Sequence, residues 1–155
     1  MAPVPFGFLQ HTAVPMSVTL AFVIAEIDQR DDPSQRKLRL PDEALIRRYE
    51  AATGFTFSAD YRLFLMTVSN AFVGTLYPLI LNDAMGGTHD ELFTTLHEAR
   101  AAGIPPDWLP ICADNGDYYC LTPNGTVRFW SHDGSTSEAW PDLATWAWEV
   151  WVSGN

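Results

Sequence analysis

Apolar side chains recur every three to four residues in several stretches of the chain, and this spacing predicts amphipathic helices. Residues that favour helix starts precede these stretches, and Gly54 and Gly103 follow two of them as terminators. The predicted helices are Val18–Gln29 after the cap Ser17, a helix that begins at Pro41 and stops at Gly54, a helix after the cap Ser58 that includes Tyr61–Val68, a helix from the capping box Thr88–Glu91 to Ala102, and a closing helix over Asp142–Val152.

The period of the apolar pattern changes after Pro105-Pro106 and becomes typical of strands. Asn115-Gly116 and Asn124-Gly125 are hairpin signals between the last three of these strands. The predicted strands are Leu76–Leu81, Leu109–Ala113, Asp117–Leu121 and Thr126–Trp130. The order of elements predicts one α+β domain over residues 17–155, an antiparallel or mixed sheet with helices packed on it. Residues 1–16 contain three prolines and predict an irregular arm.

If both hairpin turns have two residues, alternation of side chains sorts the meander into two faces. One face is the expected core, and the other mixes aromatic residues with an arginine, so it is either a second packed layer or a partly exposed binding surface. The expected core face is Ile111, Ala113, Tyr118, Cys120, Val127 and Phe129, and the other face is Cys112, Tyr119, Leu121, Arg128 and Trp130. The two cysteines then lie on opposite faces and should not form a disulfide.

The closing helix presents an inward stripe and two further tryptophans at its flank. The stripe is Leu143, Trp146, Ala147 and Val150. Trp148 and Trp151 are off its centre, and they either complete the core or mark a partner site.

The chain of 155 residues carries 9 basic and 19 acidic residues, a net charge of −10. This balance argues against binding nucleic acid or an anionic membrane surface, because both depend on Lys and Arg. Residues 101–155 contain seven acidic residues and one basic residue, Arg128. This excess of negative charge indicates either a solubilising surface or a binding surface that attracts a basic protein.

Two cysteines exclude a disulfide-rich secreted scaffold. No Lys or Arg precedes Arg30, so a secretory n-region is missing, and the apolar run Val18–Ile27 is too short to span a bilayer. We expect a cytoplasmic protein.

Two blocks of the sequence resemble the SUKH superfamily (SMI1/KNR4-like). Leu40–Asn70, LPDEALIRRYEAATGFTFSADYRLFLMTVSN, is similar to its front motif, in which a Gly-aromatic turn precedes Pro-x-x-Tyr-x-x-Phe-Leu and an Asn-Gly pair. Trp108–Trp151 is similar to its back half, with LPICADNGDYYCL, VRFWSHDG and a closing aromatic helix. Ser58 replaces the usual Pro and Asn70-Ala71 replaces Asn-Gly, both at structural positions.

The resemblance implies an α+β fold and a binding role without shared catalytic residues. Bacterial members of the superfamily are mostly immunity proteins that neutralise a cognate secreted toxin domain, often a nuclease. Fungal relatives regulate cell-wall synthesis. The resemblance therefore implies an immunity protein, with a scaffold or regulatory protein-binding module as the alternative.

Candidate catalytic and metal-ligating residues have structural explanations. His89, Asp90 and Glu91 fall in a first helical turn, where acids complement the helix dipole, and Cys112 has the acidic neighbour Asp114 but no nearby base. No GxSxG, HExxH or P-loop motif occurs. We therefore expect no enzyme, no metal and no cofactor; a catalytic pocket built from His132, Asp133 and Cys112 is the third hypothesis.

The expected partner is a cognate protein toxin, such as a nuclease or another enzyme with a basic active site, and neither nucleic acid nor a membrane. Acidic turns would attract it and aromatic side chains would supply affinity. The predicted contact residues are Asp114, Asp117, Tyr119, Arg128, Trp130, His132 and Asp133.

Overall fold

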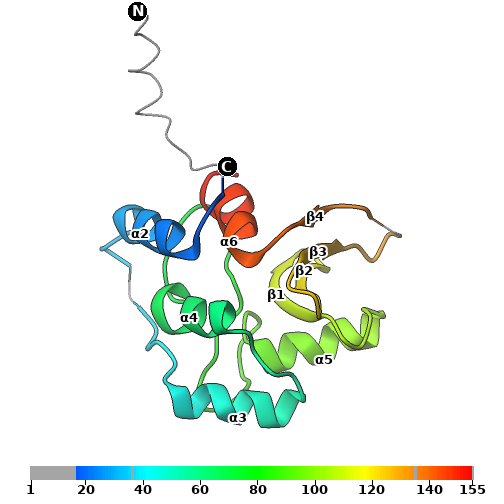
Figure 1. The fold of residues 1–155 in the computed structure, drawn as a ribbon. Helices are drawn as coiled ribbons and strands as arrows, with labels where there is room; N and C mark the ends of the chain where they lie inside the picture. Colours follow the sequence, from blue (N-terminus) through cyan, green and yellow to red (C-terminus); the bar gives the residue numbers. More distant parts are fainter. Residues whose placement is uncertain (1–16, 36, 135, 155) are drawn as a thin grey trace, which may run out of the picture.

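The computed structural model describes residues 17–35, 37–134 and 136–154, so the predicted irregular arm over residues 1–16 lies outside the described residues. Four helices come first, then a four-stranded antiparallel sheet in the order β1-β2-β3-β4, then a closing helical segment. The elements are α2 (Leu20–Arg30), α3 (Glu43–Thr53), α4 (Ala59–Val68), α5 (Leu92–Ala102), β1 (Leu109–Asp114), β2 (Asp117–Leu121), β3 (Val127–Trp130), β4 (Ala139–Trp140), α6 (Leu143–Trp146) and the π-helix η1 (Ala147–Val152). The predicted α+β class is confirmed (Figure 1).

Each predicted helix is present, and the differences are at the helix starts. Thr19, and not Ser17, caps α2 by accepting a hydrogen bond from Phe22 N. Pro41 stays outside α3, because Asp42 takes the cap position and accepts from Leu45 N. Ser58 caps α4 as predicted.

Glu91 is itself the cap of α5, so the predicted capping box beginning at Thr88 is wrong. The Glu91 side chain is fully buried. Its carboxylate accepts hydrogen bonds from Phe93 N (2.5 Å), Thr94 N (2.8 Å) and the Tyr49 hydroxyl (2.6 Å). The side chain that caps the start of α5 therefore also ties α5 to α3.

The predicted strand Leu76–Leu81 forms only two isolated bridges, Pro78 with Cys112 and Ile80 with Glu91. Leu79 N donates to Ile111 O (2.8 Å), and Ile80 N donates to Asp90 O (2.7 Å). The segment is extended, but its hydrogen bonds go to two different segments, and Pro78 has no N–H to donate to a ladder. The two-residue strand β4 was not predicted.

The first hairpin has the predicted register, with Cys112 opposite Tyr119 and Ala113 opposite Tyr118, and a bulge lies between Pro110 and Cys112. The second hairpin is displaced by one residue. Tyr119 pairs with Phe129 and Cys120 with Arg128, so the predicted pairs Cys120–Phe129 and Tyr119–Trp130 are wrong.

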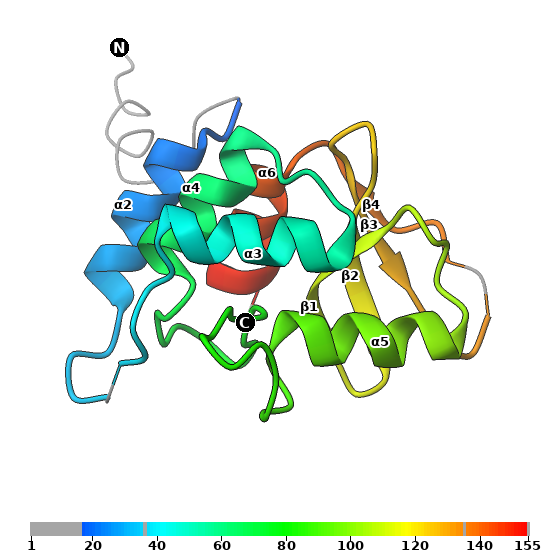
Figure 2. The ribbon, with the colours of Figure 1, turned by 90° about the horizontal axis from the view of Figure 1, so that it is seen from below.

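Because a one-residue shift turns each side chain of β3 to the opposite side, the predicted faces are wrong for this strand. Val127 is fully buried on the side of Tyr119, which faces α6 through the Tyr119–Trp146 ring contact. Arg128 and Trp130 lie on the side of Tyr118 and Cys120, which faces α5. Both faces are therefore packed, each with its own apolar cluster. The helix α5 runs across one face of the sheet (Figure 2). The smaller cluster, on the α5 side, has the buried residues Leu96, Ala99, Ile104, Tyr118 and Cys120.

Both cysteines are free and buried, as their placement on opposite sides of the hairpin predicted.

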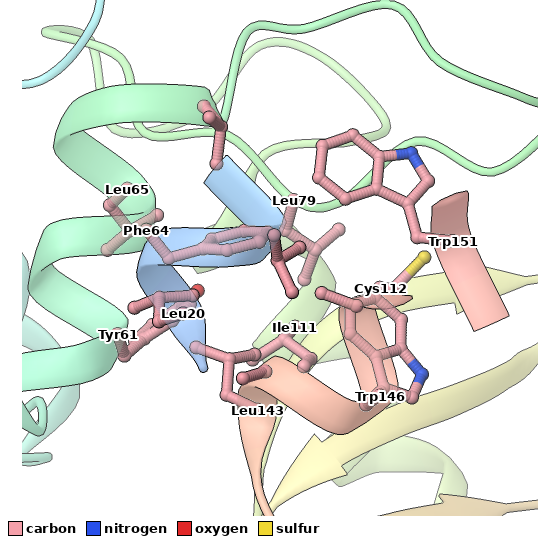
Figure 3. Close-up of a cluster of buried hydrophobic side chains, with 14 of the residues drawn as sticks. Leu20, Tyr61, Phe64, Leu65, Leu79, Ile111, Cys112, Leu143, Trp146 and Trp151 are labelled. Atoms are coloured by element: carbon pink, nitrogen blue, oxygen red, sulfur yellow. The ribbon is translucent and has the colours of Figure 1, made fainter. Parts of the chain in front are cut away.

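The closing segment begins as an α-helix and continues as a π-helix, which changes the predicted inward stripe. Trp146 and Trp151 are both fully buried, while Val150 is only partly buried. Figure 3 shows the two indoles among residues of α2, α4 and β1. Trp151 Nε1 donates to Val73 O (3.0 Å), and Trp148 packs edge-on against Phe22. Trp151 thus belongs to the hydrophobic core, and Trp148 is half-buried and packs against α2.

Candidate protein-interaction site

The β1–β2 turn brings two acidic side chains to one end of the sheet. Asn115 (φ 52°) and Gly116 (φ 88°) both adopt the left-handed conformation, which is the backbone of a two-residue type I′ turn. Asp114 and Asp117 pair directly across this turn. We call the turn 114–117, together with the turn 131–134 beside it, the hairpin end.

The second turn of the hairpin end is fastened to the first by a carboxylate. One oxygen of Asp117 accepts from His132 N (3.0 Å) and contacts His132 Nδ1 (2.6 Å), and Asp133 lies 3.3 Å from His132 Nε2. The hydrogen bond to Asp117 and the charge of Asp133 raise the pKa of His132 above its usual value. The hydrogen bond from the His132 backbone lowers the pKa of Asp117.

The acids of the hairpin end differ in how free they are to meet a partner. Asp117 is largely committed to His132, and its side chain is 21% exposed. The Asp133 side chain is 83% exposed. Asp114 is half-buried and lies near the Asn115 amide (3.4 Å). Asp114 and Asp133 are therefore the carboxylates that a basic partner could approach.

A stacked arginine lies on the same side of the sheet as His132. The Arg128 guanidinium carbon is 5.4 Å from the centre of the Trp108 ring, and Trp130 packs on Tyr118 at 6.0 Å. Trp108, Arg128, Trp130 and His132 all line one shallow depression of about 460 Å³. Trp108 is not among the predicted contact residues, and the only sequence signal for it is an aromatic side chain placed directly before the first strand of the meander.

Tyr119 lies on the opposite side of the sheet from Arg128 and Trp130. Its ring contacts Phe129, Trp140 and Trp146, with centroids 4.9 to 5.7 Å apart. Burial, and then the charge of Asp114, raise the pKa of Tyr119 to about 12. The structure thus gathers six of the seven predicted contact residues at and beside the hairpin end, and gives Tyr119 a packing role.

The proposed catalytic grouping of His132, Asp133 and Cys112 does not form. Cys112 is fully buried in the large apolar cluster on the other side of the sheet, where burial raises its pKa to about 12. His132 is exposed. Within residues 17–35, 37–134 and 136–154, no three His, Cys, Asp or Glu side chains are placed to hold a metal ion.

None of the helices in the described part of the chain is both long and apolar enough to cross a membrane.

A second surface feature is an apolar groove of about 330 Å³ between the 38–45, 69–72 and 77–90 segments. Leu38 (54% exposed) and Tyr77 (50% exposed) border it. On its polar rim, Arg39 pairs with Asp83 (2.7 Å) and Asn70 donates to Leu38 O (2.6 Å).

The helices and the antiparallel sheet form one α+β domain, and two comparisons with known proteins match it. A family model, SUKH_5, described as SMI1-KNR4 cell-wall, matches residues 20–152. The chain belongs to this family. A crystal structure of a protein from Pseudomonas syringae pv. tomato matches with a TM-score of 0.78 and 33% sequence identity, covering 84% of this chain and 97% of that one. No curated protein matches the chain significantly.

Proposed function

We propose that this protein is a cytoplasmic bacterial immunity protein that binds one cognate toxin domain and neutralises it by stoichiometric contact. The observation that carries the proposal is the hairpin end, where acidic and aromatic side chains gather at an exposed edge of a SUKH fold. Bacterial members of the superfamily are mostly immunity proteins, and family membership supports this reading.

The proposed contact residues are Asp114, Asp117, Arg128, Trp130, His132 and Asp133. A toxin that acts on nucleic acid or another anionic substrate has a basic active site, to which these carboxylates are complementary. Such complementarity accelerates encounter and fixes the orientation of the complex, while half-buried aromatic side chains supply most of the affinity.

The first experiment is a pull-down from the source cells with this protein as bait, read by mass spectrometry. A stoichiometric secreted partner whose C-terminal domain stops growth unless this protein is co-expressed is the expected result. A partner that is harmless when produced alone would overturn the immunity function.

Charge reversal at the two accessible acids tests the contact surface. We expect Asp114→Lys with Asp133→Lys to slow association with the toxin domain about tenfold or more at low salt, and to flatten the salt dependence, because long-range attraction is lost. Stopped-flow fluorescence measures this rate. The matched control is Asp28→Lys with Asp60→Lys, which changes net charge equally on exposed positions of α2 and α4. Equal association rates for the two double variants would contradict the assignment of the hairpin end as the contact surface.

A non-catalytic scaffold or regulatory module is the second candidate, because the matching family is described by its cell-wall members. Genetic context and toxicity separate the two. An immunity gene is expected directly beside a toxin gene whose product kills in its absence, and deletion of a scaffold gene exposes the cell to no toxin.

A further inference from the structure

We propose that Arg128, stacked on Trp108, is the point at which this protein binds a carboxylate side chain of its protein partner, an Asp or Glu surrounded by basic residues. The identity of the natural partner rests on the proposed function. The chemistry of the site rests on the arrangement of Arg128 alone and is tested separately below.

Three arginines stack on aromatic rings in the described part of the chain, and they differ in how their charge is met. Arg30 lies 5.4 Å from the centre of Trp148 and forms an ion pair with Glu26. Arg100 lies 5.5 Å from the centre of Phe55 and reaches the Pro106 carbonyl (3.5 Å). Arg128 has the same stacking distance as Arg30 but forms no ion pair or hydrogen bond with any described residue.

The two terminal nitrogens of Arg128 remain open to solvent. Its Nε is buried without an acceptor, whereas the two terminal nitrogens are not among the buried unpaired atoms and so retain contact with solvent. A guanidinium offers five N–H donors, and the terminal pair matches both oxygens of a carboxylate. The Trp108 ring fixes the plane of the group, so little side-chain freedom remains to be lost on binding.

The surroundings of Arg128 leave room for one side chain of a partner. Arg128 and Trp108 line the depression of about 460 Å³ beside Trp130 and His132. They also line a second depression of about 310 Å³ beside Asn124 and Thr126. Arg128 and Trp108 therefore border both depressions, and a carboxylate that enters either one lies beside them.

Charge selects the class of anion. Arg128 is the one basic residue among residues 101–155, which contain seven acidic residues. A phosphate, with nearly two negative charges, is repelled by this field more strongly than a carboxylate with one. A partner whose carboxylate is flanked by Lys or Arg satisfies Arg128 and the acids of the hairpin end together. Tryptophan and arginine are also the residues most enriched at the energetic centre of protein interfaces.

The test uses two synthetic peptides, acetyl-Lys-Lys-Glu-Lys-Lys-amide and its Gln counterpart, titrated into the ¹⁵N-labelled full chain. We expect the Glu peptide to bind in the millimolar range, at least about threefold more tightly than the Gln peptide, and to shift the signals of the Arg128 guanidinium and the Trp108 indole. Equal dissociation constants for the two peptides would overturn the proposal, and so would shifts confined to other residues.

Variants assign the effect to Arg128. In Arg128→Met, whose apolar stem still covers Trp108, the preference for Glu over Gln is expected to vanish. Arg128→Lys should retain part of it, because the charge remains and the planar fork is lost. Arg30→Met, a matched stack whose charge is met by Glu26, should retain all of it. A preference that persists in Arg128→Met contradicts the proposal, and if that variant misfolds, the wild-type comparison of the two peptides decides.

The natural complex gives the second readout. Against a toxin domain found as above, Arg128→Met should raise the dissociation constant at least about tenfold, and Arg30→Met should leave it unchanged. Because the peptide titration needs no toxin, a failed search for a toxin removes the proposed function and leaves the carboxylate site to be judged by itself.

Discussion

At the hairpin end, His132 is a side chain whose charge can change near neutral pH. Its raised pKa stabilises the folded state below the usual histidine value of about 6.5, and this contribution is lost as pH rises through the folded-state pKa. Asp117, with a lowered pKa, contributes in the opposite sense, and its contribution is lost in acid. The two turns are therefore most firmly joined in mildly acidic solution, between the two pKa values.

This pair gives a prediction at the scale of one residue. We expect the NMR titration of His132 to have a midpoint above about 6.5. Asp117→Asn should lower that midpoint more than Asp133→Asn, because the hydrogen bond to Asp117 is the largest cause of the shift. A midpoint that is insensitive to both substitutions contradicts the described contacts.

Turn residues also decided where sequence reasoning succeeded in the sheet. Asn115 and Gly116 both have positive φ, so the two-residue turn and the register of the first hairpin were predictable. Around Asn124-Gly125 only Gly125 has positive φ. Thr122 N donates to Thr126 O (2.9 Å), which closes a three-residue loop in which the Asn124 side chain bonds to Thr122 Oγ1 (2.6 Å). The same Asn-Gly dipeptide thus occurs in two types of turn. The side-chain hydrogen bonds that accompany the longer loop are not visible in the periodicity of the sequence.

Among the helices, α5 depends on a contact from a distant element. Glu91 and Tyr49 are 42 positions apart in the chain, and their buried hydrogen bond joins the start of α5 to α3. Burial is the main cause that raises the pKa of Tyr49. The same hydroxyl also donates to Asn82 O at 3.3 Å, so loss of Glu91 leaves it only this longer hydrogen bond, which is destabilising.

We therefore expect Glu91→Ala to lower the free energy of unfolding by about 2–4 kcal/mol, from the lost cap and the weakened Tyr49 contact. Urea denaturation measures this change. Tyr49→Phe should cost about 1–3 kcal/mol, and the double variant less than the sum of the two, because both substitutions remove the same hydrogen bond. Strictly additive losses would show that the contact does not couple the helices.

The closing element shows a limit of helical periodicity. Spacing of three and four residues placed Val150 inward and left Trp151 at the flank. In η1 the backbone bonds from i to i−5, as Ser153 N to Trp148 O (2.8 Å) illustrates, and the wider turn puts Trp151 on the side of Trp146. Local propensity did not signal this change. In the π-helical arrangement the Trp151 indole donates to Val73 O, a tertiary contact that the sequence pattern does not contain.

Across the whole molecule, the helices and the sheet face each other through one large apolar cluster, with a smaller one beneath α5. Order of elements and turn signals sufficed to predict the α+β class. Six of the seven predicted contact residues lie at and beside the hairpin end, and their contact with a partner stays a prediction. The role of Trp108 and the packing role of Tyr119 depend on the register of β3 and on the approach of the 105–108 segment, which are tertiary facts. The sequence of this chain does not encode which protein it binds, and the binding experiments above identify that partner.

The position of the two cysteines gives the protein a natural probe for each half of its interior. Cys112 belongs to the large cluster and Cys120 to the small one, and burial raises the pKa of each thiol to about 12. Neither thiol can react with an alkylating reagent until its own cluster opens. We expect Cys120 to be labelled first under native conditions, because its cluster is smaller, with mass spectrometry resolving the two sites and the single variants Cys112→Ala and Cys120→Ala checking each rate. Identical labelling rates would instead mean that the two apolar clusters open together, as a single cooperative unit.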